Sequence, residues 1–295
     1  MVVKGKIGQG YDLHMHTTAS DGLLVPRACV ELASQRGLRG IAVTDHDTVA
    51  GVAEAVDAGG EHGVDVVPGV EISARGQAGD VHVLGLWVDP FDAAFAARLA
   101  ANRDVRRGRN EAMLEALRRI GFDVRLEEAE RIAAERRADG DVSVSRPHIA
   151  ELLVRKGYVS TAREAFDSYL GEGASAYVAA ERISPEEAIR WIREAGGVAV
   201  LAHPGLYRGA DELIARLGPM LDGIEAGHAD HTDEQERSFR DTAARLGLAA
   251  TAGSDFHGVR DGDPFHAMLG SRRTDEETVE RLFHNKKKRG ILHDS

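Results

Sequence analysis

The stretch GIAVTDHDTVAGVAEAVDAGGEHGVDVVPGVEIS, residues 40–73, contains two short apolar runs separated by a helical pattern. The runs cover 40–44 and 64–70 and are rich in the β-branched residues that favour strands. Residues 49–61 between them have the pattern of a helix, and Gly63 follows closely, as glycine often does at a helix end. Alternation of strand and helix in this way predicts a parallel sheet or a (β/α) barrel.

The same alternation continues on both sides of this stretch. A strand at 12–16 and a helix at 26–35 precede it, and a strand at 81–88 follows it. The alternation returns at Ser184-Pro185-Glu186-Glu187, where an N-cap residue, a proline and two acids predict the start of a helix. The remaining expected elements are strands at 198–201, 223–225 and 248–252 and helices at 211–217 and 233–246.

Residues 92–180 interrupt this pattern. They are rich in Arg, Glu and Ala, have a helical period, and contain no strand-like run before 176–178. We therefore expect a helical insertion domain at 101–180 that caps the substrate. The barrel would be formed by residues 1–100 and 181–295.

The composition restricts the function. Of the 295 residues, 43% are hydrophobic, and 37 basic against 48 acidic residues give a net charge of −11. This balance argues against binding of duplex nucleic acid, but it permits a small anionic substrate held by local cations or metals. The single cysteine, Cys29, excludes a disulfide framework and a cysteine-based zinc site.

The chain shows no membrane signal. Its first ten residues, MVVKGKIGQG, lack an apolar segment of the signal-peptide type. No run of about 18 apolar residues occurs elsewhere, so no membrane span is expected. We expect a soluble, cytoplasmic protein with no membrane partner.

Histidines and acids gather where the predicted strands end. Each has an ordinary structural explanation when taken alone: Asp21-Gly22 as a turn, Asp45 and Asp47 as helix N-caps, His82 as a core histidine. Together they predict a metal site, because active sites of such barrels lie at the carboxyl ends of the strands and so many buried imidazoles and carboxylates would otherwise lack partners. The residues are His14, His16, Asp21, His46, Glu71, His82, His203, Asp255 and His257, with His228 following the sixth strand.

These motifs resemble the PHP (polymerase and histidinol phosphatase) family of metal-dependent phosphoesterases. The matching motifs, in order, are DLHMHTTASDG, TDHDT, GVEIS, VHVLG, LAHPG and GSDFHG, and they span residues 12–258. The resemblance implies an α/β fold, a distorted TIM-like (β/α)7 barrel. The segments SRPHIA (145–150) and YVAAERISPEEAI (177–189) further resemble the subgroup that hydrolyses small nucleotides, including nucleoside monophosphates and 3′,5′-bisphosphates.

The resemblance also implies a trinuclear metal centre whose ligand positions are all filled here. One ion would be held by His14, His16, Glu71 and Asp255; a second would share Glu71 and add His82 and His203; the third would be held by Asp21, His46 and His257. Mn, Zn and Fe all suit such mixed nitrogen and oxygen sites. The expected enzyme is a hydrolase of phosphoric esters in which a metal-bound hydroxide attacks phosphorus directly. The general acid stays open between a metal, a metal-bound water, His228 and His257.

Substrate contacts are less evident. Arg146 and His148, at the start of a predicted helix, could clamp a phosphate, with a salt bridge and a helix-terminal position as their structural alternatives. Tyr177 could stack on a base or lie buried in the insertion, and His228 is a further candidate substrate contact. The segment 171–175 is GEGAS, where we expect related sequences to carry lysines. This departure puts a second phosphate subsite in doubt.

Several alternatives remain. Amidohydrolases also build metal sites on such barrels, but their usual bridge is a carboxylated lysine, and the six lysines of this chain lie away from the predicted strand ends. A histidinol-phosphate-type phosphatase, a phosphodiesterase or exonuclease acting on short oligonucleotide ends, and an accessory module of a DNA polymerase are alternatives within the family. The expected partner is a small phosphorylated substrate, a nucleotide.

Overall fold

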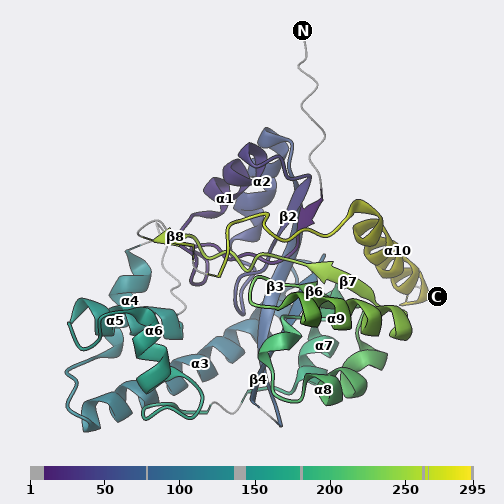
Figure 1. Ribbon diagram of the computed structural model, residues 1–295. Helices are drawn as coiled ribbons and strands as arrows, with labels where there is room; N and C mark the ends of the chain where they lie inside the picture. The colour runs from purple at the N-terminus through teal and green to yellow at the C-terminus, as the bar shows by residue number, and fades with distance from the viewer. Residues whose placement is uncertain are drawn as a thin grey trace.

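A single seven-stranded sheet organises the molecule, and its strand order follows the chain (Figure 1). The computed structural model describes residues 10–77, 79–135, 144–179, 182–260, 263–264 and 266–293. Beyond the last residue of β1, the Leu13 N–H donates to the Ala252 carbonyl in β7, which brings the two ends of the sheet together into a nearly closed barrel. The strands are β1 (Tyr11–Asp12), β2 (Gly40–Val43), β3 (Asp65–Gly76), β4 (Gly79–Leu86), β5 (Val198–Leu201), β6 (Gly223–Gly227) and β7 (Ala249–Ala252).

The expected parallel barrel is confirmed except at β4. The pairs β1–β2, β2–β3, β5–β6 and β6–β7 are parallel, whereas β3–β4 and β4–β5 are antiparallel. The reason is the connection: Gly76 pairs directly with Gly79, and parallel strands need a crossover of about a dozen residues. His82 therefore reaches the carboxyl edge of the barrel from the beginning of its strand, whereas the other motifs reach it from strand ends.

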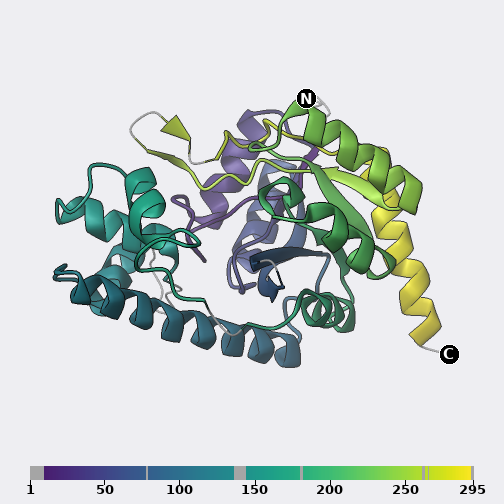
Figure 2. The same cartoon turned by 60° about the horizontal axis from the view of Figure 1, so that its bottom comes forward.

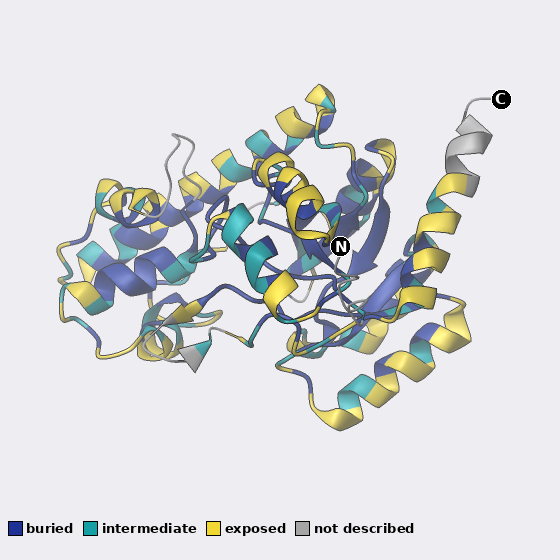
Figure 3. Cartoon of the chain, turned by 90° about the horizontal axis from the view of Figure 1, so that it is seen from above, coloured by how far each residue is buried: buried dark blue, intermediate teal, exposed yellow. Residues whose placement is uncertain are grey.

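Helices cover the outside of the barrel. In α7 the N-cap is Ser184, whose side chain accepts from the Glu187 N–H, as the sequence predicted. The strands are mostly buried while the outer faces of the helices are exposed (Figure 3), so the apolar core lies between the sheet and the helices. The elements around the barrel are α1 (Pro26–Gln35), α2 (Val52–His62), α7 (Pro185–Glu194), η2 (Pro204–Leu206), α8 (Ala210–Leu217), η3 (Gly218–Met220), α9 (Asp233–Leu246), β8 (Val259–Arg260), β9 (Asp263–Pro264) and α10 (Glu276–His293).

The helical insertion has a hydrophobic core of its own, formed by residues between Met113 and Ala176. Its elements are α3 (Ala93–Arg119), α4 (Leu126–Ala134), α5 (Arg146–Arg155), α6 (Ala162–Ala165) and η1 (Phe166–Leu170). The strand expected at 176–178 is wrong: Ala176 and Tyr177 donate their N–H groups to the carbonyls of Tyr169 and Ala174 in turns.

The long helix α3 joins the insertion to the barrel (Figure 2). Phe95 and Leu99, near its beginning, belong to the barrel core, whereas Met113 and Leu117 belong to the core of the insertion. The predicted domain boundary between residues 100 and 101 falls inside this helix, and the division into domains remains a prediction. Because α3 belongs to both cores, its middle turns lie over the rim of the barrel.

Asp47 fixes α3 to that rim. Its buried carboxylate accepts hydrogen bonds from Asn102 Nδ2 at 2.8 Å and from Arg106 Nη2 at 2.8 Å. Arg103 donates a further hydrogen bond to the backbone carbonyl of Asp47. Burial alone would raise the pKa of Asp47, but the charges of Arg106 and Arg182 outweigh it and hold the pKa below its ordinary value. Asp47 follows His46, so the same loop positions a candidate metal ligand and the middle of α3.

Among the described residues, no helix is both long and apolar enough to span a membrane.

Candidate metal centre

The strand ends bring all of the predicted ligand side chains to one edge of the barrel. His14 and His16 lie just beyond β1, His46 follows β2, and Asp255 and His257 follow β7. Backbone bridges join these segments where the regular sheet has ended, between Met15 and Phe256 and between His46 and Glu71. The remaining ligand candidates come from the loop after β1, from β3, from β4 and from the end of β5: Asp21, Glu71, His82 and His203.

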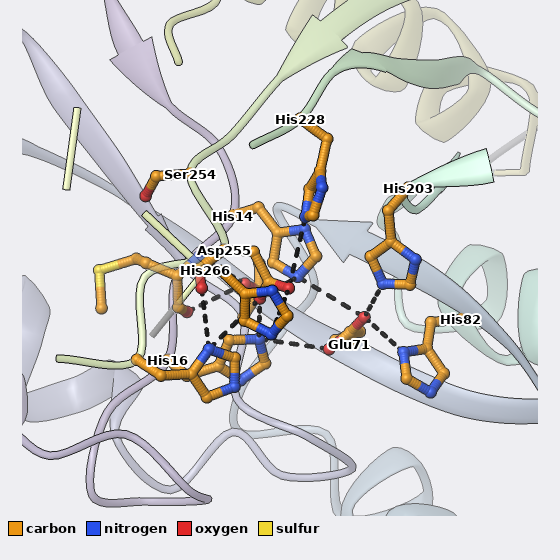
Figure 4. A network of polar contacts seen from close by, with 12 residues as sticks. His14, His16, Glu71, His82, His203, His228, Ser254, Asp255 and His266 are labelled. Atoms are coloured by element: carbon orange, nitrogen blue, oxygen red, sulfur yellow. Dashed lines mark hydrogen bonds and ion pairs between the residues drawn. The ribbon is translucent and has the colours of Figure 1, made fainter. Parts of the chain in front are cut away.

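Glu71 lies at the middle of this cluster, between His14, His203 and His82 (Figure 4). Its Oε1 is 2.8 Å from His82 Nδ1 and 3.0 Å from His203 Nε2. Its Oε2 is 2.9 Å from His46 Nδ1 and 3.3 Å from His16 Nε2. Both carboxylate oxygens therefore face imidazole nitrogens, which is the arrangement that a bridging carboxylate needs.

Two further carboxylates complete the cluster. Asp255 Oδ1 is 3.1 Å from His16 Nε2 and 3.3 Å from His14 Nε2. Asp21 Oδ1 is 3.3 Å from His257 Nε2, and its Oδ2 is 3.8 Å from His46 Nε2. Sets of three or four ligand atoms within 4.8 Å of one another can be drawn repeatedly through these residues.

Several of these atoms are buried without a hydrogen-bond partner among the described residues: His14 Nε2, His16 Nε2, His46 Nδ1 and Asp255 Oδ1. An unsatisfied buried polar atom costs about 1–3 kcal/mol, so a cluster of them requires compensation. Divalent cations that accept nitrogen and oxygen ligands would satisfy all of these atoms at once. The residues therefore fit a metal centre.

The electrostatics agree with this fit. Burial would raise the pKa of Glu71, Asp255 and Asp21. The charges and hydrogen bonds of the surrounding histidines have a larger effect and hold the pKa of each carboxylate well below its ordinary value. Burial lowers the pKa of His46 and His203 to about 4, which keeps both rings neutral and able to bind a metal. At neutral pH the centre thus offers three negative charges and the lone pairs of His46 and His203. The carboxylates beside His14 and His16 outweigh burial and raise the pKa of both rings, to about 10 for His16, so a cation that binds there takes the place of a proton.

Sequence reasoning missed two residues that contact this centre. Glu225 lies in β6 and contacts His14 Nδ1 at 3.0 Å. His266 contacts Asp230 through Nδ1 at 2.7 Å, and its Nε2 is 3.6 Å from Asp255 Oδ2. Glu225 looked like an ordinary strand residue, and His266 belongs to no recognisable motif, so the sequence held no local signal for either.

A cavity of about 340 Å³ opens over the metal centre and reaches the helical insertion. Of the four expected substrate contacts, Arg146 lines it. His148 is 1% exposed and its ring completes a capping box with Ser145, while the Tyr177 hydroxyl accepts a hydrogen bond from Arg75. His228 is 0% exposed and faces Asp255. The side chains of His148, Tyr177 and His228 therefore contact other parts of the protein and do not line the cavity.

Three arginines that the sequence analysis did not single out also line this cavity: Arg106 and Arg109 from α3 and Arg182 from the segment before α7. In the sequence RDVRRGRN (103–110) the first two look like part of a charged helix surface. The Nε atoms of all three are buried without a hydrogen-bond partner among the described residues. The wall opposite the metal centre is therefore cationic.

Gly253 supports the metal centre by leaving room for His14. A Cβ at this position would lie 2.3 Å from His14 Cβ and 2.7 Å from its backbone nitrogen, both too close. Gly253→Ala should lower the free energy of unfolding by about 1–3 kcal/mol, because the strand end must move. Denaturant unfolding of the metal-free protein measures this.

The matched control for this substitution is Gly60→Ala in α2, where an added Cβ meets nothing within 4 Å. Alanine favours a helix over glycine by about 1 kcal/mol, so the control should be neutral or more stable. Equal stability of the wild type and Gly253→Ala would contradict the packing argument.

Comparisons with known proteins agree with this geometry. The family model described as "PHP domain" matches residues 12–126. A 3′,5′-nucleoside bisphosphate phosphatase of Chromobacterium violaceum is 39% identical over 263 residues, which cover 85% of this chain and 88% of that protein. A 5′-3′ exoribonuclease of Haemophilus influenzae is 36% identical over 252 residues, covering 84% of this chain and 89% of that protein.

A solved structure has the same fold. The crystal structure of a putative metal-dependent phosphoesterase from Bifidobacterium adolescentis superposes with a TM-score of 0.83 at 34% sequence identity. The match covers 93% of this chain and 96% of that one, so it includes the helical insertion as well as the barrel.

Proposed function

The chain belongs to the PHP domain family and is a metal-dependent phosphoesterase, and from this premise we propose that it removes one phosphate from a nucleoside 3′,5′-bisphosphate. The metal centre would hold the phosphate that is cleaved, and the arginines across the cavity would hold the other. The relatives support hydrolysis of phosphoric esters in general. The choice of a bisphosphate rests on the arginine cluster.

For the metal centre we propose three divalent ions, of Mn, Zn or Fe. Their ligands would be His14, His16, Glu71 and Asp255 for the first, Glu71, His82 and His203 for the second, and Asp21, His46 and His257 for the third. The buried nitrogen and oxygen atoms without partners in these sets support the proposal. Ions of this kind supply water activation near neutral pH and neutralise phosphate oxygens.

The chain's own residues would orient the substrate between two walls. Glu71 and Asp255 fix the positions of the histidines around them, so one phosphate is always received at the same place. On the opposite wall the guanidinium groups of Arg109, Arg146 and Arg182 can donate hydrogen bonds to a second phosphate. Between them, Phe166 and Leu206 offer apolar surface to the nucleoside.

The single observation that carries the bisphosphate is the surplus of positive charge on the arginine wall. Arg106, Arg109, Arg146 and Arg182 face the cavity, while the nearby acids are Asp47, already bonded to Arg106, and Asp80. Burial together with its arginine neighbours lowers the pKa of Arg109 to about 8, and the charge of Asp80 at 3.8 Å does not offset them. An anion bound here would offset the repulsion between these positive charges. A nucleoside monophosphate held at the metal centre has no second phosphate that could be this anion.

These arginines could form the second phosphate subsite that the lysine-free segment 171–175 does not provide. The missing lysines there argued against a second phosphate subsite. Arginine suits such a subsite better than lysine, because its planar guanidinium can give two parallel hydrogen bonds to one phosphate.

A panel of phosphate esters tests the proposal. The purified protein, loaded with Mn²⁺ or Zn²⁺, is given nucleoside 5′-phosphates, 3′-phosphates and 3′,5′-bisphosphates, and phosphate release is measured. We expect kcat/KM to be highest for the bisphosphates, by about 10–100-fold, since a charged hydrogen bond contributes about 1.5–3 kcal/mol. Equal kcat/KM values for monophosphates and bisphosphates would contradict a second phosphate subsite.

A second candidate function is removal of the terminal nucleotide from short RNA. A neighbouring cavity of about 430 Å³ shares Leu206 with the first, so a chain continuing from the scissile phosphate would find space there. Its charged lining is mixed, with Arg208 and Arg216 beside Asp80, Glu172 and Glu212. The similar exoribonuclease of Haemophilus influenzae is consistent with this. A 5′-phosphorylated dinucleotide in the same panel decides: release of a nucleoside monophosphate would support this activity.

A further inference from the structure

Glu225 and His228 are buried beside the metal centre and do not line the cavity. Both are 0% exposed. They come from the end of β6, three residues apart, and each contacts a different candidate ligand, His14 in one case and Asp255 in the other. Burying a carboxylate and an imidazole costs free energy unless each is paired with a suitable partner.

Glu225 sets the orientation of the His14 ring. Its Oε1 and Oε2 lie 3.0 and 3.1 Å from His14 Nδ1, and its Oε2 also accepts the backbone N–H of His203 at 2.7 Å. With Nδ1 donating its hydrogen to Glu225, the lone pair of His14 lies on Nε2. That atom faces Asp255 Oδ1 at 3.3 Å and Glu71 Oε1 at 3.5 Å, where a cation would satisfy all three atoms.

His228 acts on Asp255 in the complementary way (Figure 4). Its Nδ1 accepts the backbone N–H of Asp230 at 3.1 Å, so in the neutral ring the hydrogen lies on Nε2. Nε2 then donates to Asp255 Oδ2 at 3.4 Å. The other oxygen, Oδ1, is left facing His14 Nε2 and His16 Nε2 and has no hydrogen-bond donor among the described residues.

We propose that Glu225 and His228 are positioning residues: Glu225 directs His14 Nε2, and His228 directs Asp255 Oδ1, toward the same metal ion. The proposal rests on the proposed function in taking His14 and Asp255 as ligands of one ion. Partners of this kind fix the tautomer of a ligating histidine and the free oxygen of a ligating carboxylate. Their loss typically costs about 10–100-fold in metal affinity.

Metal binding tests this without reference to turnover. Each variant is stripped with a chelator, and its affinity for Zn²⁺ is measured by competition with a chromophoric chelator, together with the visible absorption of the Co²⁺-loaded protein. Glu225→Gln should bind the ion held by His14 and Asp255 about 10–100-fold less tightly and shift the Co²⁺ bands. The control Glu234→Gln, an exposed residue on α9, should match the wild type.

For His228 a pair of variants separates positioning from packing. His228→Gln can still place a donor where Nε2 lies, whereas His228→Asn is too short to reach Asp255. We expect the glutamine variant to retain most of the wild-type metal affinity and the asparagine variant to lose it. Thermal unfolding of the metal-free proteins shows whether each variant is folded, and the comparison is made between variants that are.

The outcomes are distinct. If Glu225→Gln and His228→Asn fold and bind Zn²⁺ as tightly as the wild type, the proposal is overturned while the phosphoesterase proposal stands. His14, Glu225 and His228 could also hold an ion themselves. Loss of one whole ion from Glu225→Gln, with the affinity for the others unchanged, would show this and overturn the positioning role. A wild type that binds no ion would overturn the proposed function itself.

Discussion

Glu71→Gln should remove nearly all phosphatase activity, with kcat/KM lower by at least about 10³-fold, which corresponds to about 4 kcal/mol of lost transition-state stabilisation. The substitution keeps the size and shape of the side chain. It removes the charge and replaces one acceptor oxygen with an N–H donor.

The expected loss is large because Glu71 is shared by the whole centre. Its two oxygens face the ring nitrogens of five histidines, at distances from 2.8 Å to 3.5 Å. An amide at this place would direct N–H hydrogens at these ring nitrogens and at any cation bound between them. The loss of the bridge therefore affects the ligand geometry of more than one ion.

Metal content and activity are measured on the same preparation. The variant should release no phosphate above the background and should retain fewer ions after gel filtration than the wild type. The exposed Glu234→Gln variant again serves as the control. Full metal content together with wild-type kcat/KM in Glu71→Gln would rule out a bridging role for this residue.

The metal centre could be predicted from the sequence because most of its candidate ligands lie in or close to an apolar run. His46 follows IAV and His203 follows VAVLA, so strand and ligand lie in one short motif. Once the strands are taken as neighbours in a barrel, the ends must meet at one edge. The structure brings these side chains together, and their roles as ligands remain a proposal that metal analysis can test.

The substrate side could not be predicted in the same way. Arg106 and Arg109 lie in a helix whose charged residues look like a solvent-facing surface, and only the docking of α3 on Asp47 turns them into the cavity. That docking joins residues more than fifty positions apart. The antiparallel course of β4 depends likewise on a hairpin, which alternation of strand and helix does not reveal.

The arginine wall leads to the second prediction with a large effect. Replacing Arg109 and Arg182 together with methionine should lower kcat/KM for a nucleoside bisphosphate by at least about 100-fold, since each charged hydrogen bond contributes about 1.5–3 kcal/mol. The change should appear mainly in KM. Hydrolysis of a phosphate monoester that lacks a second phosphate should change little, because the metal centre is untouched.

The double methionine variant should bind the bisphosphate more weakly than the wild type, but without ligand it should be at least as stable. Burial and the charges of neighbouring arginines lower the pKa of both Arg109 and Arg182, so in the ligand-free protein these cations are held without sufficient counter-charge. Methionine removes two like charges from a crowded wall and retains most of the side-chain volume. The melting temperature of the ligand-free variant should therefore equal or exceed that of the wild type.

Ligand-induced stabilisation connects the two effects. In the metal-free protein, inorganic phosphate or sulfate bound at the arginines should raise the melting temperature of the wild type as its concentration rises, and this rise should be absent in the double variant. Arg107→Met is the matched control, because Arg107 lies on the same helix, is 66% exposed and pairs with Glu130 outside the cavity. If the double variant lost activity equally toward bisphosphates and monophosphates, the arginines would support the metal centre and the second phosphate subsite would have to lie elsewhere.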